Sequence, residues 1–336
     1  DKTRREEMPI DLAGLPGPLR ELLEADTAPS AELLLERAEA ALDKAESAGS
    51  SRITGAVGPS APQRSTDRFL LGCMELAEKR DVPLHTHLLE TKTQAHHAQG
   101  VYGKTIPEHL HGLGYLTPRA SFAHAVWVTD SDVQLLAENG CRVAHNPGSN
   151  LKLGSGIAPV RKFLDAGVPV GLGIDGANSS DKGSVFYQAR LAALIHCVRD
   201  GDAARGVSPF EALRMAARGG AAVMLMEDKL GTLETGKQAD LVVLDRTLNF
   251  EPWLDPVSAL AFAEDGESVE SVFIEGEEVV RDGRALVADR EEMLRIVEGA
   301  ARRLRENLPE AVAEAESLRP HLHGVSRKYS AITMVR

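Results

Sequence analysis

From residue 31 to residue 225, short apolar runs alternate with segments of helical periodicity, and this alternation is the strongest constraint on the fold. The runs expected to form strands are 52–57, 82–89, 120–128, 141–145 and 168–174. The segments expected to form helices are 31–47, 66–80, 94–111 (part loop), 131–139, 157–166, 184–199 and 209–225. Such alternation is typical of parallel β/α units. It predicts an α/β fold, either a (β/α)8 barrel or a doubly wound sheet.

Polar side chains gather at or beyond the C-terminal halves of these strands: His87, Glu90, His124, His145 and Asp175. In a β/α barrel this is the face where active sites lie, and in a doubly wound sheet the same ends form the ligand crevice. Five strands that carry inward-pointing histidine and aspartate favour the barrel.

The run 82–89 contains two histidines in an otherwise apolar sequence. Because side chains alternate along a strand, His85 and His87 point to one face and Thr86 to the other. A lone histidine on such a strand is more often a core residue with one hydrogen bond than a metal ligand. Glu90, however, follows His87 by three residues, a spacing that lets His87 bind a metal while Glu90 moves protons nearby.

Four groups at separate strand ends, His87, Glu90, His124 and Asp175, together favour a site. A zinc-type divalent ion binds imidazole nitrogens and carboxylates, and it lowers the pKa of water in its open position. Asp175 is suited to ligate the ion and to take the proton of that water, and Glu90 to carry a proton to the substrate. His124 is suited either to ligate the ion or to hydrogen-bond the water and the developing oxyanion.

Composition restricts the class of partner. The chain has 50 acidic and 38 basic residues and a net charge of −12, which argues against nucleic acid or an anionic membrane surface. No apolar run approaches the roughly 20 residues that span a bilayer. The three cysteines, Cys73, Cys141 and Cys197, are widely spaced and odd in number, which indicates no disulfide framework and favours a reducing cytoplasm.

The character of the chain changes after residue 228. Short, alternating, glycine-punctuated runs over 229–286 predict a small antiparallel β unit, with a tight turn at Glu275-Gly276-Glu277. Residues 289–317 are charged and amphipathic, and we expect a helix broken near Pro309 with a solvated charged face. The predicted organisation is therefore a barrel portion (1–228), a small β unit (229–286) and a C-terminal helical extension (287–336).

Five motifs carry a resemblance to a known family: LHTHLLET (84–91), FAHAVWV (122–128), VAHNPGSNLKLGSG (143–156), GLGIDG (171–176) and GTLETGKQADLVVLD (231–245). Together they resemble the metal-dependent amidohydrolase superfamily, in the aminohydrolase and chlorohydrolase branch that includes adenosylhomocysteine/methylthioadenosine deaminases. The resemblance implies a (β/α)8 TIM-type barrel beside a small β-sandwich, and residues 229–286 would be part of that sandwich.

The resemblance also implies roles for individual residues. His87 matches a metal ligand of the fifth barrel strand, and Glu90 matches the proton shuttle three residues later. His124 matches the sixth-strand histidine that orients water and substrate without being a mandatory metal ligand in this branch, and Asp175 matches the eighth-strand aspartate that is both ligand and base. His145 matches a seventh-strand motif that shapes a loop or lines the substrate pocket.

The sequence leaves two alternatives for Trp127 and favours a structural role for His85. Trp127 either lines the substrate pocket or packs against a helix, and His85 is expected to be a packed histidine with a satisfied hydrogen bond. His96 and His97 lie on a polar helix and are expected to be exposed.

Two departures from the family pattern concern the N-terminal half. The family's first metal ligands form a His-x-His pair on the first strand, and nothing before Arg52 supplies it. The expected strands then correspond to strands four to eight, with strands one to three missing, as in an N-terminal truncation. Residues 58–62 read Gly-Pro-Ser-Ala-Pro, with Ser60 where nucleoside-type deaminases of the family have a histidine, which counts against an adenosine-like substrate.

The resulting hypothesis is a hydrolase of C–N bonds that deaminates an amino-substituted N-heterocycle of the purine, pterin, pyrimidine or triazine type. One divalent metal ion is implied, with zinc favoured and iron or manganese as alternatives, and a homo-oligomer is compatible with the family. The alternatives are a dechlorinating or cyclic-amide hydrolase on the same fold, and a non-catalytic truncated barrel.

Overall fold

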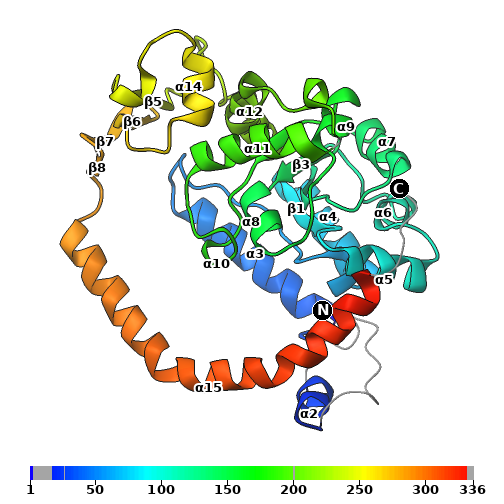
Figure 1. Cartoon of the computed structure of the whole chain (residues 1–336). Coiled ribbons are helices and arrows are strands. Elements are labelled where there is room, and N and C mark those ends of the chain that lie inside the picture. The colour runs from blue at the N-terminus through cyan, green and yellow to red at the C-terminus, as the bar shows by residue number, and fades with distance from the viewer. Residues whose placement is uncertain (3–16, 26, 200, 331–336) are drawn as a thin grey trace.

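The computed structural model describes residues 1–2, 17–25, 27–199 and 201–330 (Figure 1). Its centre is a parallel sheet of four strands in the order β1-β2-β3-β4. These strands are β1 (Leu84–Leu88), β2 (Ala120–His124), β3 (Arg142–His145) and β4 (Val170–Leu172). Leu84 pairs with Ala120, and Val143 pairs with Val170. The predicted β/α alternation and parallel pairing are therefore confirmed for these four strands.

The predicted strand at 52–57 is reduced to one residue. Val57 forms an isolated parallel bridge with Leu84, and its N–H donates to the carbonyl of Pro83 while its carbonyl accepts from His85. The prediction of a full strand was wrong, although the segment lies at the expected edge of the sheet. Only its last residue reaches β1 before the proline-containing segment 58–62 leads the chain into a 3₁₀ turn.

The helices of this part precede, connect and follow the strands. They are α2 (Gly17–Ala25), α3 (Ala31–Ser47), α4 (Asp67–Arg80), α5 (Lys92–Tyr102), α6 (Ile106–Gly112), α7 (Asp130–Glu138), α8 (Pro147–Lys152), α9 (Val160–Asp165), α10 (Ala177–Ser180), α11 (Val185–Arg199), α12 (Pro209–Arg214) and α13 (Gly220–Val223). Two short 3₁₀ segments, η2 (Pro62–Arg64) and η3 (Ala203–Arg205), and a π-helix, η4 (Met215–Gly219), complete the described residues of this part. A further 3₁₀ segment, η5 (Leu248–Phe250), follows the first strand of the second part.

Capping residues fix where several of these helices begin. Thr91, Thr105, Thr129 and Ser208 each form a capping box, in which the side-chain oxygen and a residue three positions later satisfy two backbone N–H groups. The expected helix at 66–80 begins after Thr66, whose hydroxyl accepts from the third N–H of α4. Local sequence therefore sets the helix boundaries beside the strand ends.

Apolar side chains fill the space between the sheet and its helices. Leu84, Leu88 and Phe122 on the strands are at most 1% exposed, as are Leu136 and Phe163 on or beside the covering helices. Burying a side chain of this size contributes about 1.5–3 kcal/mol. This core holds the C-terminal ends of the strands in a fixed arrangement.

A glycine contact closes the β4 edge of the sheet. The predicted helix at 209–225 is present as α12, η4 and α13 in succession, with a π-helical turn in the middle. A Cβ atom built on Gly219 would lie 1.9 Å from the carbonyl oxygen of Val170. The backbones approach this closely only because Gly219 and Gly171 carry no side chain.

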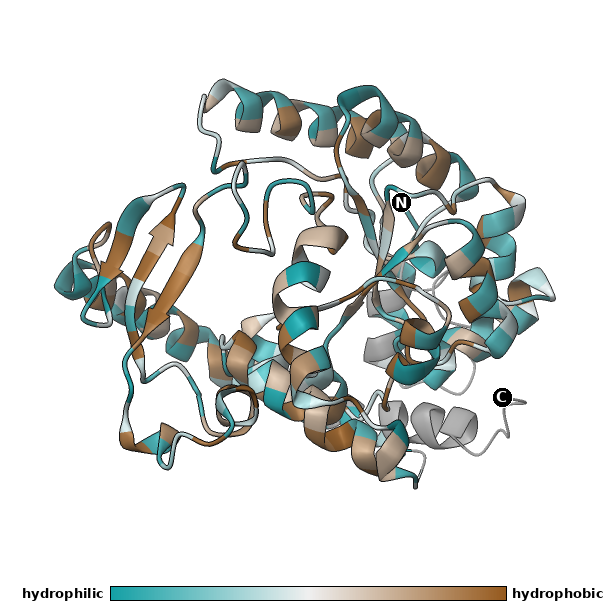
Figure 2. Ribbon diagram, turned by 90° about the horizontal axis from the view of Figure 1, so that it is seen from above, coloured by the Kyte–Doolittle hydropathy of each residue, from teal (hydrophilic) through white to brown (hydrophobic). Residues whose placement is uncertain are grey.

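The second part is an antiparallel sheet in the order β5-β6-β7-β8, with α14 (Pro256–Phe262) inserted between its first two strands. The strands are β5 (Leu241–Leu244), β6 (Val269–Ile274), β7 (Glu277–Arg281) and β8 (Arg284–Ala285). Figure 2 shows the apolar colour along its longer strands. The predicted tight turn is confirmed, because Glu275 and Gly276 both have positive φ between β6 and β7. In the described residues this β unit is a single sheet.

The C-terminal part is one long helix, α15 (Arg290–Ser330). The expected break near Pro309 was wrong, because the helix continues through both Pro309 and Pro320. A proline inside a helix removes one hydrogen bond and bends the axis without necessarily ending it, and Figure 1 shows α15 as an arc. Among the described residues, no helix is both long enough and apolar enough to cross a membrane.

Candidate metal centre

Three of the predicted residues meet at the C-terminal ends of the parallel strands. His87 lies near the end of β1, His124 is the last residue of β2, and Asp175 follows β4 by three residues. One ligand atom from each residue lies within 4.8 Å of the others. The expected convergence of side chains from different strands is therefore present in the structure.

The imidazole of His87 is held by the backbone of the segment before η2. Its Nδ1 lies 2.5 Å from the carbonyl oxygen of Ser60, so this nitrogen donates a proton and Nε2 keeps its lone pair. The ring also stacks on that of His124, with centroids 5.4 Å apart and planes 18° apart. Ser60 thus contacts the centre through its backbone carbonyl, which any residue type at this position would supply.

His124 is held in a comparable way, but inside the protein. The residue is 1% exposed, and its Nδ1 lies 2.8 Å from Oδ1 of Asn150 in α8. Its φ of 73° lies in the left-handed region, and Ala125 after it has a φ of 45°. Non-glycine residues adopt this region at a cost, which often marks functional sites. Here the two residues turn the chain sharply where β2 ends.

Asp175 also has a left-handed backbone, with a φ of 59°, and its side chain is exposed. The hydroxyl of Ser149 donates to Oδ2 at 2.5 Å. Partial burial pushes the pKa of Asp175 upward, but hydrogen bonds from Ser149, the Gly176 backbone and Ser179, together with nearby His124, leave the pKa below its usual value. The carboxylate therefore remains ionised near neutral pH.

Glu90 lies outside this three-residue cluster. Its Oε1 accepts a hydrogen bond from the hydroxyl of Ser155 at 3.1 Å. The carbonyl of the same Ser155 accepts from the indole N–H of Trp127 at 2.7 Å, and Lys92 Nζ lies 5.8 Å from the Trp127 ring centroid. Trp127 also lines a small cavity of about 110 Å³. Ser155 is thus a shared anchor for Glu90 and Trp127.

His145 does not support the predicted substrate contact. It is fully buried, with its Nε2 3.2 Å from Nε2 of His196 in α11, and its Nδ1 has no partner among the described residues. Burial, with smaller effects from the charges of His196 and His124, lowers the pKa of His145 well below its usual value. His196 is buried as well, at 3% exposure.

The structure also shows the burial and hydrogen bonding of His85 and His97. His85 is hydrogen-bonded as expected, with Nδ1 2.7 Å from the Ser121 hydroxyl, and burial followed by the charges of His87 and His124 lowers its pKa to about 4. The prediction that His97 is exposed was wrong. It is 5% exposed on the inner side of α5, and neither ring nitrogen has a partner in the part of the chain that the structure describes.

Sequence reasoning missed the residues that hold the predicted ones. Ser149, Asn150 and Ser155 lie within the motif at 143–156, yet the sequence assigned them no role. Their position could have indicated a supporting role, because small polar residues that follow a strand end can hydrogen-bond groups at neighbouring strand ends. Which groups they reach depends on the path of α8, which the sequence does not specify.

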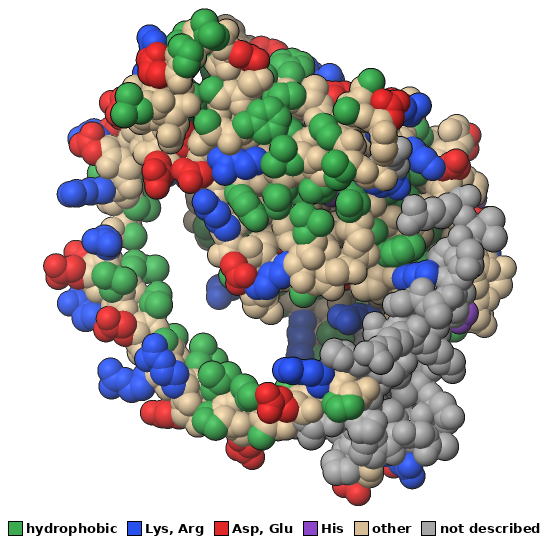
Figure 3. Space-filling view, viewed as in Figure 1, with side chains coloured by type: hydrophobic (Ala, Val, Ile, Leu, Met, Phe, Trp, Pro, Cys, Tyr) green, Lys and Arg blue, Asp and Glu red, His purple; other side chains and the backbone are tan. Residues whose placement is uncertain are grey.

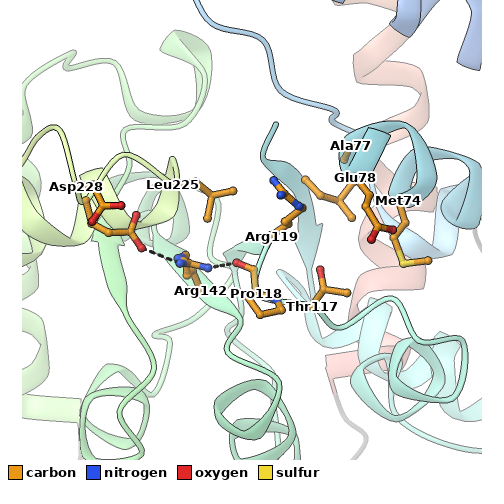
Figure 4. A pocket seen from close by; sticks show the side chains of 11 residues that line it. Met74, Ala77, Glu78, Thr117, Pro118, Arg119, Arg142, Leu225 and Asp228 are labelled. Carbon is orange, nitrogen blue, oxygen red and sulfur yellow. Dashed lines mark hydrogen bonds and ion pairs between the residues drawn. The ribbon is translucent and has the colours of Figure 1, made fainter. Parts of the chain in front are cut away.

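A larger cavity lies at the opposite ends of the strands. It measures about 620 Å³ and includes Leu84 at the start of β1 and Arg142 at the start of β3. Figure 4 shows Arg142 between Pro118 and the segment 225–228, and its Nη2 lies 2.8 Å from Oε1 of Glu227. The predicted residues are absent from its lining, so we place the candidate site at the cluster, where the donor atoms are.

The residues of the cluster fit a divalent metal of the zinc type. Two imidazole nitrogens and one carboxylate are ligands that zinc prefers, and each imidazole already has its Nδ1 occupied, which directs Nε2 to a metal. The ligand atoms of the cluster all lie within 4.8 Å of one another, so the three side chains are placed to share one ion.

Comparison with known proteins gives a consistent result. The model of the Amidohydrolase family matches residues 7–279. A 5-methylthioadenosine/S-adenosylhomocysteine deaminase of Nitratidesulfovibrio vulgaris is 42% identical over 235 residues, which are 69% of this chain and 53% of that protein. The chain therefore spans about half the length of this relative.

Two solved structures share the fold. A zinc-bound adenosine deaminase from Xanthomonas campestris has a TM-score of 0.79 and 30% identity, covering 83% of this chain and 63% of that one. An atrazine chlorohydrolase from Arthrobacter aurescens, complexed with zinc, has a TM-score of 0.74 and 28% identity, covering 80% and 60%. Both likenesses support a TIM-barrel-like α/β fold.

Proposed function

The chain belongs to the amidohydrolase family, and from this premise we propose that it is a metal-dependent hydrolase that deaminates an amino-substituted N-heterocycle. The observation that carries the proposal is the convergence of His87, His124 and Asp175 from three strand ends within 4.8 Å. The names of the relatives favour an adenosine-type heterocycle. Ser60 contacts the centre only through its backbone, so the absence of a histidine side chain at this position still counts against this substrate class.

We propose zinc as the metal, with His87, His124 and Asp175 holding it. This assignment rests on the donor set and on the zinc in the two similar structures. When bound, such an ion supplies Lewis acidity that lowers the pKa of water to near neutrality.

The protein groups then divide the proton transfers between them. Asp175, whose pKa is held below its usual value, accepts a proton from the attacking water at its carboxylate. Glu90, held by Ser155, delivers a proton to a ring nitrogen of the substrate. His124 contributes as a ligand, because its Nδ1 proton is directed to Asn150 and no ring N–H remains for the oxygen added to the ring carbon. Cleavage of the bond to the exocyclic nitrogen, with proton transfer to it, releases ammonia and leaves a carbonyl group.

We also propose how the strands and segments of this chain correspond to a complete barrel. The bridge at Val57 and strands β1 to β4 are proposed to correspond to the fourth to eighth strands of an eight-stranded barrel. The proposed domains are a barrel portion (1–228), a small β unit (229–286) and a helical extension (287–336).

Two substitutions test the assignment of roles. Glu90→Gln should abolish ammonia release and leave zinc content unchanged, because Glu90 lies outside the cluster. Asp175→Asn should reduce both, because it removes a ligand charge and the base. Ammonia release from a panel of purines, pterins, pyrimidines and triazines, with zinc measured on the same samples, provides the readout. Near-normal turnover in either variant would refute the proton-transfer roles of Glu90 and Asp175.

A second candidate is displacement of chloride or an alkylamine on the same fold. The structural similarity to the atrazine chlorohydrolase, with a TM-score of 0.74, supports this second candidate reaction. Product analysis separates the two candidates, since chloride or an alkylamine would appear in place of ammonia.

A further inference from the structure

We propose that two consecutive residues of α8, Ser149 and Asn150, are positioning residues that prepare the centre for its metal. Asn150 sets the tautomer of His124, and Ser149 orients the carboxylate of Asp175. The inference rests on the proposed function and deepens it, because neither residue belongs to the ligand cluster itself.

The short helix α8 is firmly placed between the strand ends. Ser149 and Asn150 are at most 1% exposed. The backbone N–H of Gly148 donates to Oε1 of Gln188 in α11 at 2.9 Å, in a buried position. A Cβ on Gly148 would lie 2.9 Å from that side-chain amide, so the helix and α11 are in close contact. Side chains from α8 are therefore held in one position relative to β2 and to the segment after β4.

The direction of the Asn150 amide decides which nitrogen of His124 is available. With Oδ1 of Asn150 at 2.8 Å from Nδ1, Nδ1 must carry the proton, and Nε2 keeps the lone pair that a metal needs. If the amide were turned, Nδ2 would donate to Nδ1 and Nε2 would carry the proton. Only an acceptor at this position therefore prepares His124 as a ligand.

Asn150 is an unfavourable residue for stability in this position. Its Nδ2 is buried and has no partner among the described residues, and a buried donor without a partner costs free energy. A leucine of similar size would remove that cost. Asn150 therefore orients His124 but lowers the stability of the fold, a trade-off that is common at functional sites.

Ser149 has the matching role for the carboxylate. Its hydroxyl donates to Oδ2 of Asp175 at 2.5 Å, which fixes the orientation of the carboxylate. Adjacent residues of one helix thus hold ligands from two different strands, His124 from β2 and Asp175 after β4. Any movement of α8 would displace both ligands together.

The test compares zinc affinity, measured by competition with a chromophoric chelator, in Asn150→Leu, Asn150→Asp and the unmodified chain. Loss of a group that orients a ligand typically weakens metal binding about 10- to 100-fold, and we expect this for Asn150→Leu. Asn150→Asp retains an acceptor for Nδ1 and should bind zinc close to the unmodified chain. The melting temperature of metal-free Asn150→Leu should be unchanged or higher.

Ser155→Ala is the matched control, because it removes a nearby hydroxyl that contacts Glu90 and none of the ligands. Its zinc affinity should stay unchanged. Wild-type affinity in Asn150→Leu, or equal weakening in the leucine and aspartate variants, would overturn the positioning role. An unmodified chain that binds no zinc would instead overturn the proposed function itself.

Discussion

Residues at the candidate centre are held in unfavourable backbone conformations. His124, Asp175 and Leu89, which follows β1, have φ values of 73°, 59° and 45°. Each lies where a parallel strand ends and the chain must turn toward the next helix. Such conformations persist only where surrounding contacts enforce them, and at His124 and Asp175 the hydrogen bonds to Asn150 and Ser149 supply those contacts.

The ligand cluster could be predicted from the sequence because it depends on two regular rules. Side-chain alternation placed His85 and His87 on one face, and parallel strands bring their C-terminal ends to one edge. The supporting hydrogen bonds could not be predicted, since Asn150 reaches His124 only through the position of α8. The exposure of His97 was predicted wrongly for a related reason. Which side of a short polar helix is buried depends on the elements that pack against it.

His97 gives a prediction for stability and its pH dependence. Burial, with a smaller effect from the charge of Lys2, lowers the pKa of His97. The unfolded chain therefore binds a proton at this residue more readily, so stability falls as the pH drops below about 6.5. His97→Leu removes this proton uptake and two nitrogens that have no partner among the described residues. It should raise the free energy of unfolding by about 1 kcal/mol at pH 7.

The same experiment predicts a trend with pH. In urea unfolding at pH 7 and pH 5, the advantage of His97→Leu should be larger at pH 5. The exposed His111 offers a comparison, and His111→Leu should stay within about 0.5 kcal/mol of the unmodified chain at pH 7. A His97→Leu variant that is less stable than the unmodified chain would show that the ring has a partner in solution.

At the scale of elements, the packing of η4 on β4 depends on one glycine. Gly219→Ala would place a methyl group 1.9 Å from the Val170 carbonyl oxygen and 3.0 Å from the Gly171 Cα. These are backbone atoms, so the two elements must separate, and we expect a loss of about 1–3 kcal/mol in the free energy of unfolding. Chemical denaturation measured by circular dichroism provides the readout.

The adjacent Gly220 is a natural control for this prediction. It has the same helical backbone, but a Cβ built on it meets nothing within 4 Å. Because alanine is favoured over glycine in a helix by up to about 1 kcal/mol, Gly220→Ala should be neutral or stabilising. Equal effects of the two substitutions would mean that η4 does not lie against β4.

Elements with strong local signals were predicted well, and elements decided by tertiary contacts were not. Helices α3 and α4 begin within one residue of their predicted starts, after the N-caps Ser30 and Thr66, because capping depends on nearby residues. The segment 52–57 has an apolar strand-like sequence, yet only Val57 pairs with β1. Pro309 suggests a helix end by its residue type, although a proline can also be accommodated by bending.

At the scale of the whole molecule, the α/β body and α15 differ in how much they bury. In the body, the strands and covering helices share one core. Along α15, Leu294, Val297, Leu304 and Leu308 are each between 48% and 69% exposed, although their spacing of three, seven and four residues places them on one side of the helix. Figure 3 shows hydrophobic side chains exposed along the arc that α15 forms.

This difference predicts that a protease will cut α15 before it cuts the α/β body. Cleavage of a helix requires local unfolding, which costs least where few apolar contacts are lost. Arg302, Arg303 and Arg305 are exposed on α15, whereas Arg142 in the body is mostly buried and paired with Glu227. Limited trypsin digestion followed by mass spectrometry should therefore give cleavage at 302–305 before any cleavage between residues 67 and 225. Early resistance of α15 would show that its apolar side is covered in solution, which would contradict the exposure of Leu304 and Leu308 in the structure.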